Sequence, residues 1–426
     1  MRDRLRQRHP ATIVLVALIA AVFFFTPVAV WVVGVRAKPI ENRPFTPLPH
    51  VSDGWDAFDQ LTQWGIDRLP LRADAIRLNN DLTEKVFHEL PTLGAAGGPV
   101  GVGQTGHVGG EGSAQAGPQP RALQVIEGRD GWLFYGDEFV RACEPEATPE
   151  SVVDGLRRLG EILRASGREL IFATPPDKHT LSGRFLPSDL PERDCAEQAD
   201  ADRHARLKAA ALPGWVDMRT ALERQQQEAG RPIYLQRDTH WDGSGDVVFA
   251  RSLADAIDPA LLRETRFRPQ PQPVRFVGDL TAIAGDATES EDERYDTVRR
   301  GVRAVGAPRT TTNATNYPIT TSRFERSDDG AALVEQPTLL YGDSFAERSL
   351  PLVQPFFARL TRIPELSRAA ASGALPPAEQ ELIAQIEANR LILLEQVERT
   401  LWGSKEASIV QPAFLDRLAA ALDVDR

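Results

Sequence analysis

Residues 337–344, Pro-Thr-Leu-Leu-Tyr-Gly-Asp-Ser, carry the strongest structural signal in this chain of 426 residues. The apolar run before Gly342 predicts a short buried β-strand. Gly342 permits a tight turn, so Ser344 is expected just beyond the carboxyl end of that strand. Ligands of open α/β sheets bind at this end, which makes Ser344 a candidate nucleophile.

A candidate base for Ser344 lies much earlier in the chain, in the sequence Asp238-Thr239-His240-Trp241. On a looped or extended backbone, side chains two positions apart project to the same side, whereas a helix places them on opposite faces. The turn-forming residues 242–245, Asp-Gly-Ser-Gly, favour a loop. Asp238 can then orient His240 through Nδ1 and leave Nε2 free to accept the proton of Ser344, as a Ser-His-Asp triad requires.

Spacing alone leaves three other interpretations open. The Gly-Asp-Ser sequence can simply turn the chain, with Asp343 bonding backbone amides there. His179 competes as the base, because Asp177 also precedes it by two residues. An Asp-x-His pair can be half of a metal site, but the seven histidines show no ligand-spaced cluster. The pattern therefore indicates neither a metal nor another cofactor.

Predicted strands and helices alternate from about residue 122 onward. Apolar residues at 125–126 and 132–135 predict a hairpin with its turn at 128–131. Thr148 followed by Pro149 predicts the start of a helix that ends near residue 165. Further strands are expected at 169–174, 215–216, 338–341 and 391–394, further helices at 201–211, 219–228, 246–257, 376–389 and 412–422, and irregular β structure at 266–317. This alternation indicates an α/β fold with a mostly parallel sheet.

The composition limits the function and the compartment. The formal net charge is −11, so the chain is a poor general binder of nucleic acid. It would also repel a polyanionic glycan unless a local basic patch intervenes. The two cysteines, Cys143 and Cys195, suit one disulfide in an oxidising compartment, with two buried free thiols as the alternative.

An apolar, uncharged segment at residues 12–35 follows arginines at positions 2, 4, 6 and 8. It is long enough to cross a bilayer core, which needs about 20 residues, and the arginines should keep the N-terminus in the cytoplasm. A cleaved signal peptide is the alternative, but its apolar region is typically about 7–15 residues long. We therefore expect a single-pass anchor in a bacterial inner membrane, with the soluble domain in the periplasm or at the cell exterior.

The expected organisation has five parts. They are a cytoplasmic N-terminus (1–11), a transmembrane anchor (12–35), a juxtamembrane helical segment (36–91), a Gly-rich flexible loop (92–120) and an α/β domain (121–426). The loop shows no apolar periodicity with which to bury a face.

Together these motifs resemble the AlgX/AlgJ group of polysaccharide O-acetyltransferases, which have an SGNH-hydrolase-like domain. The matching segments occur in the family's order at 41–43, 128–134, 176–178, 238–241, 342–345 and 395–399. Little chain follows residue 402, so we expect no C-terminal carbohydrate-binding module and a closer likeness to the membrane-anchored AlgJ type.

The resemblance implies a three-layer α/β/α domain with a mostly parallel sheet, preceded by one transmembrane helix. It also implies that Ser344 is the nucleophile, His240 the base and Asp238 the group that orients the base. Ser344 would take an acetyl group, and a hydroxyl of an extracytoplasmic polysaccharide would then attack the acyl-enzyme. A multi-spanning membrane acyltransferase would supply the acetyl donor.

Three neighbours of the motifs are candidates for binding substrate. Trp241 and Phe345 could stack on a sugar, and Arg348 could bind an anionic or carbonyl group. Core packing of the aromatic rings and a solvated helix face for Arg348 are the alternatives.

Two rival functions also stay open. A carbohydrate acetyl esterase would use the same triad but admit water to the acyl-enzyme. A non-catalytic glycan-binding subunit of an export complex would not need Ser344, His240 and Asp238 all to be present, so their presence argues against it.

Overall fold

The computed structural model describes residues 125–284, 286–312, 318–366, 375–403 and 409–424, with a few isolated positions between 25 and 68. The chain divides into two units. One comprises Met1–Ala96 and Thr281–Ala287, and the other Gly97–Leu280 and Thr288–Arg426.

The first unit is described at few positions. Those around Trp31 are helical, and the N–H of Val33 donates to the carbonyl oxygen of Ala29 at 3.1 Å. No helix within the described positions is long and apolar enough to cross a membrane. The predicted anchor at 12–35 and the juxtamembrane segment at 36–91 lie mostly outside the described residues, and the Gly-rich loop at 92–120 lies wholly outside them. All three stay predictions.

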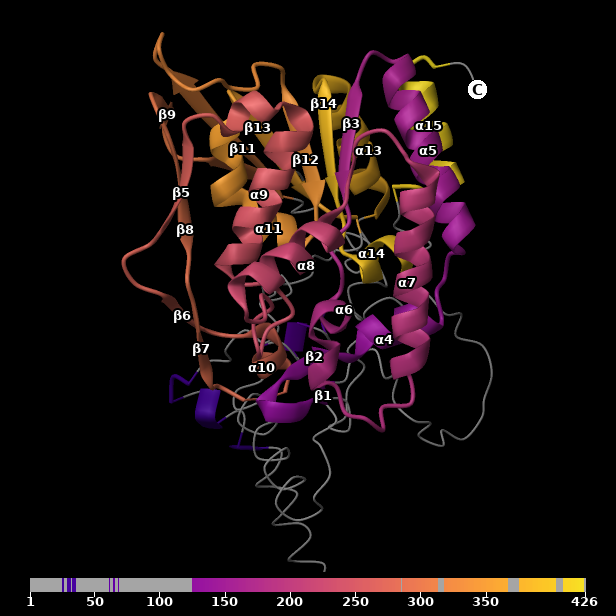
Figure 1. Ribbon diagram of the computed structural model, residues 1–426, viewed down its shortest axis with the longest axis vertical. Coiled ribbons are helices and arrows are strands. Elements are labelled where there is room, and N and C mark those ends of the chain that lie inside the picture. The colour runs from indigo at the N-terminus through magenta and orange to yellow at the C-terminus, as the bar shows by residue number, and fades with distance from the viewer. Residues whose placement is uncertain are drawn as a thin grey trace, which may run out of the picture. The chain divides into compact units, whose positions relative to one another are not determined.

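Within the described residues, the second unit is built on a mixed sheet of eight strands (Figure 1). Five neighbours in the order β13-β12-β14-β3-β4 run parallel, and β11, β10 and β9 extend the sheet in antiparallel pairing. The predicted parallel sheet is thus confirmed at the centre, and the antiparallel edge makes the whole sheet mixed. Its strands are β3 (Glu169–Ala173), β4 (Trp215–Val216), β9 (Val302–Ala304), β10 (Arg309–Thr312), β11 (Pro318–Arg326), β12 (Thr338–Gly342), β13 (Arg359–Pro364) and β14 (Leu391–Glu395).

Short two-stranded ladders accompany this sheet. They are β1 (Val125–Glu127) with β2 (Leu133–Tyr135), β5 (Thr265–Pro269) with β8 (Tyr295–Arg299), and β6 (Val274–Val277) with β7 (Glu289–Asp292). The first is the predicted hairpin. The other two show that β5 to β8, which fall in a region predicted to be irregular, form regular antiparallel pairs. The sequence did not indicate these strands because they are mostly exposed and polar and show little apolar alternation.

The helices complete the α/β alternation. They are α4 (Gly136–Cys143), α5 (Pro149–Ala165), α6 (Lys178–Ser182), α7 (Arg193–Ala210), α8 (Met218–Ala229), α9 (Gly243–Ile257), α10 (Asp279–Ile283), α11 (Ser344–Val353), α13 (Leu375–Ala388), α14 (Glu398–Gly403) and α15 (Pro412–Ala421), with 3-10 turns η4 (Arg129–Gly131), η5 (Gly183–Phe185), η6 (Pro259–Leu262) and η7 (Gln354–Phe356).

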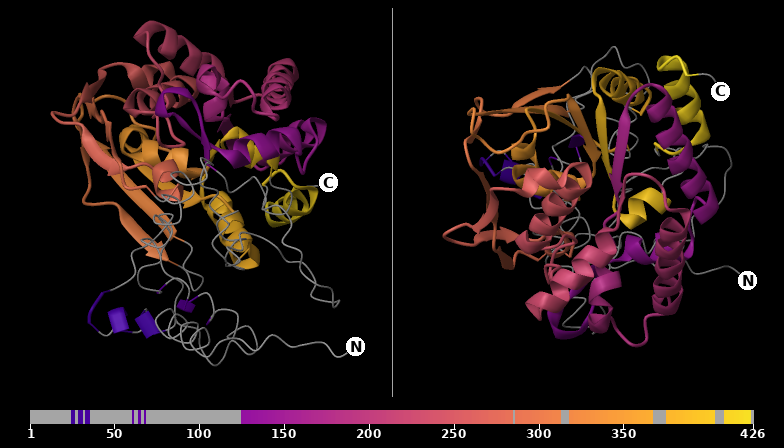
Figure 2. Two further views of the ribbon diagram at one scale, coloured as in Figure 1. Left: turned by 90° about the horizontal axis from the view of Figure 1, so that it is seen from below. Right: turned by 45° about the horizontal axis from the view of Figure 1, so that its top comes forward.

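Side chains of the central strands alternate between two apolar cores. In β12, Leu340 packs into one core, whereas Leu339 and Tyr341 pack into the other. Helices α9 and α11 cover the first core, and α5, α13 and α15 cover the second. Figures 1 and 2 show these two sets of helices on opposite sides of the sheet. The predicted three-layer α/β/α arrangement follows from this alternation.

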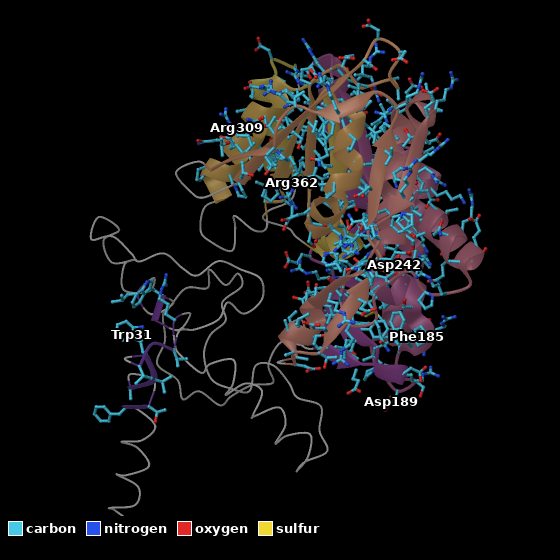
Figure 3. All side chains as sticks on the ribbon, turned by 90° about the vertical axis from the view of Figure 1, so that its left-hand side faces the viewer. Trp31, Phe185, Asp189, Asp242, Arg309 and Arg362 are labelled. Atoms are coloured by element: carbon cyan, nitrogen blue, oxygen red, sulfur yellow. A yellow bond between two sulfur atoms is a disulfide. The ribbon has the colours of Figure 1, made fainter. Side chains whose placement is uncertain are left out.

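Two helices begin earlier than predicted. Helix α7 starts at Arg193 and buries few apolar side chains, so it lacks the periodicity that marks a helix. Helix α9 starts at Gly243 because Asp242, labelled in Figure 3, is its N-cap and accepts from the N–H groups of Ser244 and Gly245. The expected turn is therefore the first turn of a helix.

The predicted disulfide is present. Cys143 at the end of α4 is bonded to Cys195 in the first turn of α7, with the two Cα atoms 5.6 Å apart. The bond joins two segments on one side of the domain that no sheet ladder connects.

Candidate active site

Ser344 is the first residue of α11 and directly follows the turn after β12. All five residues of β12 are buried, which anchors this turn in the core. Gly342 is needed there, since a Cβ atom would come within 2.6 Å of Ala346 Cβ and 2.7 Å of Glu395 Oε2. Asp343 caps the helix by accepting from the N–H of Phe345 at 2.9 Å. The sequence thus fixes Ser344 at a helix N-terminus.

Buried carboxyl groups hold the nucleophile turn to the end of β14. Asp343 also accepts from the N–H of Val397 at 2.8 Å, and Glu395 Oε2 accepts from the N–H groups of Asp343 and Ala346, each at 3.1 Å. Burial and the nearby Asp343 raise the pKa of Glu395 well above its usual value, which favours the protonated form of this carboxyl group. Asp343 thus bonds backbone amides in the turn, which confirms the structural role predicted for it. Residues 395–397 hold the turn in place through these hydrogen bonds.

His240 lies between Ser344 and Asp238. Its Nε2 atom is 2.7 Å from Ser344 Oγ, and its Nδ1 atom is 2.7 Å from Asp238 Oδ1. Asp238 Oδ1 also accepts from the backbone N–H of His240 at 2.9 Å. The segment is a loop, as predicted, and it is held by a β-bridge between Tyr234 and Trp241. The structure therefore brings the three predicted residues into one hydrogen-bonded chain.

The charges of this chain suit proton transfer. Burial alone would lower the pKa of His240, but the Asp238 carboxylate outweighs burial and raises it. Burial would raise the pKa of Asp238, yet His240 and the N–H groups of Asp279 and His240 lower it below its usual range. Asp238 is therefore an anion that stabilises an imidazolium at His240. The His240 side chain stays 15% exposed, and Ser344 is half-buried.

Asp279, at the start of α10, belongs to the site although the motifs did not reveal it. Its N–H donates to Asp238 Oδ2 at 2.9 Å, and its carboxylate accepts from the N–H of Thr239 at 2.7 Å and from the Thr239 hydroxyl. Its Oδ2 atom is also 3.7 Å from His240 Nδ1. Partial burial and the neighbouring Asp238 raise the pKa of Asp279. Residues Gly278-Asp279 lie within the stretch 266–317, which was predicted to be irregular, and carry no motif that links them to His240.

Asp238, His240 and Asp279 each offer one ligand atom within 4.8 Å of the others, so the group could ligate a cation. However, both oxygens of Asp238 accept from backbone N–H groups, and Asp238 Oδ1 holds His240 Nδ1 at 2.7 Å. A cation would have to replace that last bond. The geometry favours the imidazole as the partner of Asp238.

The predictions that Trp241 and Phe345 stack on a sugar are wrong. Both side chains are fully buried, and their rings pack edge to face with centroids 4.7 Å apart. Phe345 also packs beneath the His240 ring, with centroids 4.6 Å apart. No ring face is left for a sugar, because the core occupies both; the two residues support His240 instead.

Arg348 is likewise not placed to bind substrate, because its guanidinium group is buried and paired with two carboxylates of the protein. Its side chain is 8% exposed, lies 3.3 Å from Asp246 Oδ2, and donates to Asp292 Oδ2 at 2.6 Å. Asp246 Oδ1 in turn accepts from the indole N–H of Trp241 and from the hydroxyl of Ser349, each at 2.8 Å. This network ties the helix that carries Ser344 to the loop that carries His240.

His179, the rival base, is paired with buried carboxylates rather than with Ser344. Its side chain is fully buried, with Nδ1 3.1 Å from Glu138 Oε2 and Nε2 2.6 Å from Asp200 Oδ2. Burial would lower the pKa of His179, but these carboxylates raise it well above its usual value. Asp177 pairs with Arg399 rather than with His179. His179 is thus a buried structural cation, and the proposal that it acts as the base is wrong.

Comparisons with known proteins agree with the sequence motifs. The matching family model describes an SGNH hydrolase-like domain, acetyltransferase AlgX, and covers residues 125–373. A probable alginate O-acetylase AlgJ of Pseudomonas putida is 27% identical over 165 residues, which are 38% of this chain and 41% of the relative. The Pseudomonas fluorescens protein of the same name is 32% identical over 136 residues, which are 31% of this chain and 33% of the relative. The matches span between a third and two fifths of these relatives.

Solved structures also resemble this chain. The O-acetyltransferase domain of Pseudomonas putida AlgJ has 20% sequence identity and a TM-score of 0.45, covering 70% of this chain and 99% of that domain. Pseudomonas aeruginosa AlgX has 14% identity and a TM-score of 0.45, covering 70% of this chain and 67% of its own. The family match includes the His240 loop, β12 and Ser344, and it covers more than half of the chain. The chain therefore belongs to the family of SGNH hydrolase-like domains of the acetyltransferase AlgX type.

Proposed function

We propose that this protein is an O-acetyltransferase that transfers an acetyl group to hydroxyls of an extracytoplasmic polysaccharide. The observation that carries the proposal is the continuous chain of short contacts from Ser344 Oγ through His240 to Asp238. Membership of the AlgX family and similarity to probable alginate O-acetylases support the acetyl group and the polysaccharide acceptor.

In the first half-reaction, Ser344 Oγ attacks the carbonyl carbon of the acetyl donor while His240 Nε2 takes the hydroxyl proton. The negative charge develops on the carbonyl oxygen, beside the helix N-terminus of α11. The backbone N–H of Ser344 has no hydrogen-bond partner within the described residues, and it can donate to that oxygen. His240 then returns its proton to the leaving group, and the acetyl ester of Ser344 remains.

In the second half-reaction, a sugar hydroxyl replaces the donor. His240 Nε2 takes the hydroxyl proton as the sugar oxygen attacks the ester carbonyl. The bond to Ser344 Oγ breaks, and Oγ recovers the proton from His240. The products are an acetylated sugar and the free serine. Asp238 stabilises the imidazolium in both halves and keeps its own charge.

The cellular setting forms part of the proposal. Residues 12–35 anchor the chain in the inner membrane and place the domain in the periplasm, where a multi-spanning acyltransferase presents the acetyl donor. The disulfide between Cys143 and Cys195 supports an oxidising compartment.

The test uses the full chain in mild detergent, an activated acetyl ester and a glycan oligomer. Acetylated oligomer is measured by mass spectrometry and free acetate by an enzymatic assay, for the wild type and for Ser344→Ala. Transfer that disappears in Ser344→Ala supports the proposal. Acetate release without any transfer favours the esterase, and no turnover by the wild type favours the non-catalytic glycan-binding subunit.

A further inference from the structure

Lys178, the first residue of α6, is a buried cation beside the loop that carries Asp238 and His240. Helix α6 lies next to β2 (Figure 1), and the lysine reaches from one to the other. Its ammonium group donates to three backbone carbonyl oxygens at 2.5, 2.9 and 3.0 Å, those of Leu133, Gln236 and Asp238. No step of the proposed reaction uses this lysine, yet two of its three acceptors lie in the segment that carries the base.

The surroundings of Lys178 suit a charged ammonium group. Such a group has three hydrogens and no acceptor, so each hydrogen meets one of the three oxygens. The rings of Trp132 and Phe134 add cation–π contacts, with Nζ 5.0 Å and 5.3 Å from their centroids. Burial lowers the pKa of Lys178 to about 7, although nearby carboxylates, that of Glu138 foremost, raise it. The three oxygens and the two rings counter the effect of burial and favour the charged form.

The bonds from Lys178 fix the path of the loop between Leu235 and His240. The N–H of Leu235 donates to the carbonyl oxygen of His240 at 3.0 Å and closes the loop at its base. Within this loop, the carbonyl oxygens of residues 236 and 238 both point toward Lys178 Nζ. Asp238 is thus held at both ends, because its carboxylate accepts from the N–H groups of His240 and Asp279. A shift of its backbone would move the carboxylate away from His240 Nδ1.

Lys178 is itself anchored to the side of the site that carries the nucleophile. Its neighbour Asp177 accepts from the backbone N–H of Arg399 at 2.8 Å and pairs with the guanidinium group of that arginine. Arg399 lies in α14, just after β14, and the end of β14 holds the turn of Ser344. Residues 177 and 178 therefore join the loop of the base to the strand that supports the nucleophile turn.

We propose that Lys178 is a positioning residue of this site: its ammonium group fixes the backbone of residues 236–238 so that Asp238 meets His240. The proposal rests on the proposed function, since it concerns the same triad. Within the described residues, the ammonium group donates to the three carbonyl oxygens, so it acts through Asp238 and not on the substrate. Its loss should therefore lower kcat and leave the KM of a small ester nearly unchanged.

The test uses two substitutions that remove the same charge but leave different numbers of hydrogen-bond donors. Lys178→Met fills space and donates nothing, whereas Lys178→Gln offers two hydrogens. Arg299→Met is the matched control, because Arg299 is also a buried cation that lies over a ring, with Cζ 4.5 Å from the centroid of Phe356. Arg299 likewise donates to three backbone carbonyl oxygens, those of Leu261, Ala332 and Pro355. None of these acceptors belongs to the triad or its loop.

The wild type and the three variants are compared as full chains in mild detergent. The kcat and KM for hydrolysis of an activated acetyl ester are measured well below the lowest thermal midpoint, which is recorded on the same samples. The titration of His240 is followed by NMR of protein labelled with carbon-13 histidine, and His240→Gln identifies its signal. This titration does not depend on turnover.

Lys178→Met and Arg299→Met should both lower the thermal midpoint, because each removes a buried donor group. Lys178→Met alone should lower kcat by at least about tenfold, with Lys178→Gln between it and the wild type and Arg299→Met within about twofold of the wild type. His240 should titrate at lower pH in Lys178→Met than in Lys178→Gln, because a displaced Asp238 raises the pKa of His240 less. Since both substitutions remove the same charge, this difference reports the position of Asp238.

Three results would overturn the proposal. They are wild-type kcat in both Lys178 variants, an equal loss of kcat in Arg299→Met, and identical titration of His240 in the two Lys178 variants, which assigns the effect to charge alone. If Lys178→Met does not fold, Lys178→Gln decides, and wild-type kcat in that variant overturns the proposal. Absence of ester hydrolysis in the wild type would instead refute the proposed function, and the titration of His240 would still test the role of Lys178.

Discussion

Asp238→Asn is the most informative single change, because it alters one atom and leaves the shape of the site. Asp238 now accepts three hydrogens: the Nδ1–H of His240 at 2.7 Å, and the backbone N–H groups of His240 and Asp279, each at 2.9 Å. An amide can accept at one position only. If its oxygen keeps facing His240, its NH₂ group meets the N–H of Asp279, donor against donor. If the amide flips, it donates to Nδ1 and places the proton of His240 on Nε2.

Either orientation disables the base. The flipped amide forces the tautomer that cannot take the proton of Ser344, and both orientations remove the anion that stabilises imidazolium. The loss reported for this substitution in serine hydrolase triads is about 10⁴-fold in kcat, which corresponds to about 5.5 kcal/mol. Here the lost contacts to His240 and Asp279 are of the same kind, so we expect a loss of about 10³- to 10⁴-fold.

The pH profile provides a second readout. His240 must be neutral to act as a base, and its pKa is raised by Asp238. Activity of the wild type should therefore rise with pH through a pKa above the usual histidine value. Asp238→Asn removes the charge that raises the pKa of His240. The acidic limb of the pH–rate profile should therefore move to lower pH, while the maximal rate falls.

The assay is hydrolysis of an activated acetyl ester across pH 5 to 9, with the thermal midpoint measured on the same samples. Asp217→Asn is the matched control, because Asp217 also contacts a histidine, His204 Nε2 at 2.9 Å, and caps α8 far from Ser344. The control should keep its kcat. An Asp238→Asn enzyme that retains a tenth of the wild-type kcat, with its acidic limb unmoved, would refute the role given to Asp238.

Three other changes test neighbouring parts of the structure. Trp241→Phe should cost about 1–3 kcal/mol of unfolding free energy, because it leaves Asp246 without the indole donor; a raised glycan KM at unchanged stability would restore the stacking role. Asp279→Ala should lower kcat about tenfold or more, because it removes the carboxylate that accepts from the N–H and hydroxyl of Thr239 and so holds the His240 loop; unchanged turnover would show that the loop keeps its shape without this carboxylate. Cys143→Ser should destabilise the fold by up to about 4 kcal/mol for a loop of 52 residues, and reducing agent should then have no further effect on the variant's midpoint.

Local sequence patterns predicted those strands and helices whose apolar residues repeat with the period of the secondary structure or whose ends carry capping residues. The apolar run before Gly342 predicted β12, and Thr148-Pro149 predicted the start of α5, because a buried strand and a capped helix each depend on neighbouring residues. The start of helix α7 and the regular pairing of strands β5 to β8 were not predicted, because these segments bury too little apolar surface to show a period.

The site divides in the same way. Asp238 and His240 are two residues apart, so their contact follows from a local loop geometry that the sequence states directly. Asp279 contacts the same loop because the chain returns to it after β5 and β6, and no sequence spacing indicates that return. The sequence also did not reveal which side chains are buried. Trp241, Phe345 and Arg348 adjoin the catalytic motifs in sequence, but tertiary packing buries all three side chains.

By itself, the sequence determined the nucleophile turn, the Asp-x-His loop, the alternation of strands and helices, and the family. The turn, the loop and each strand or helix depend on residues within a few positions of one another, where propensity and periodicity act, and the family follows from the order of such segments along the chain. The tertiary structure decided which histidine faces Ser344 and which carboxylates share its loop. Those outcomes depend on burial and on charges brought together by long-range packing, because desolvation and ion pairing act through space and not along the chain.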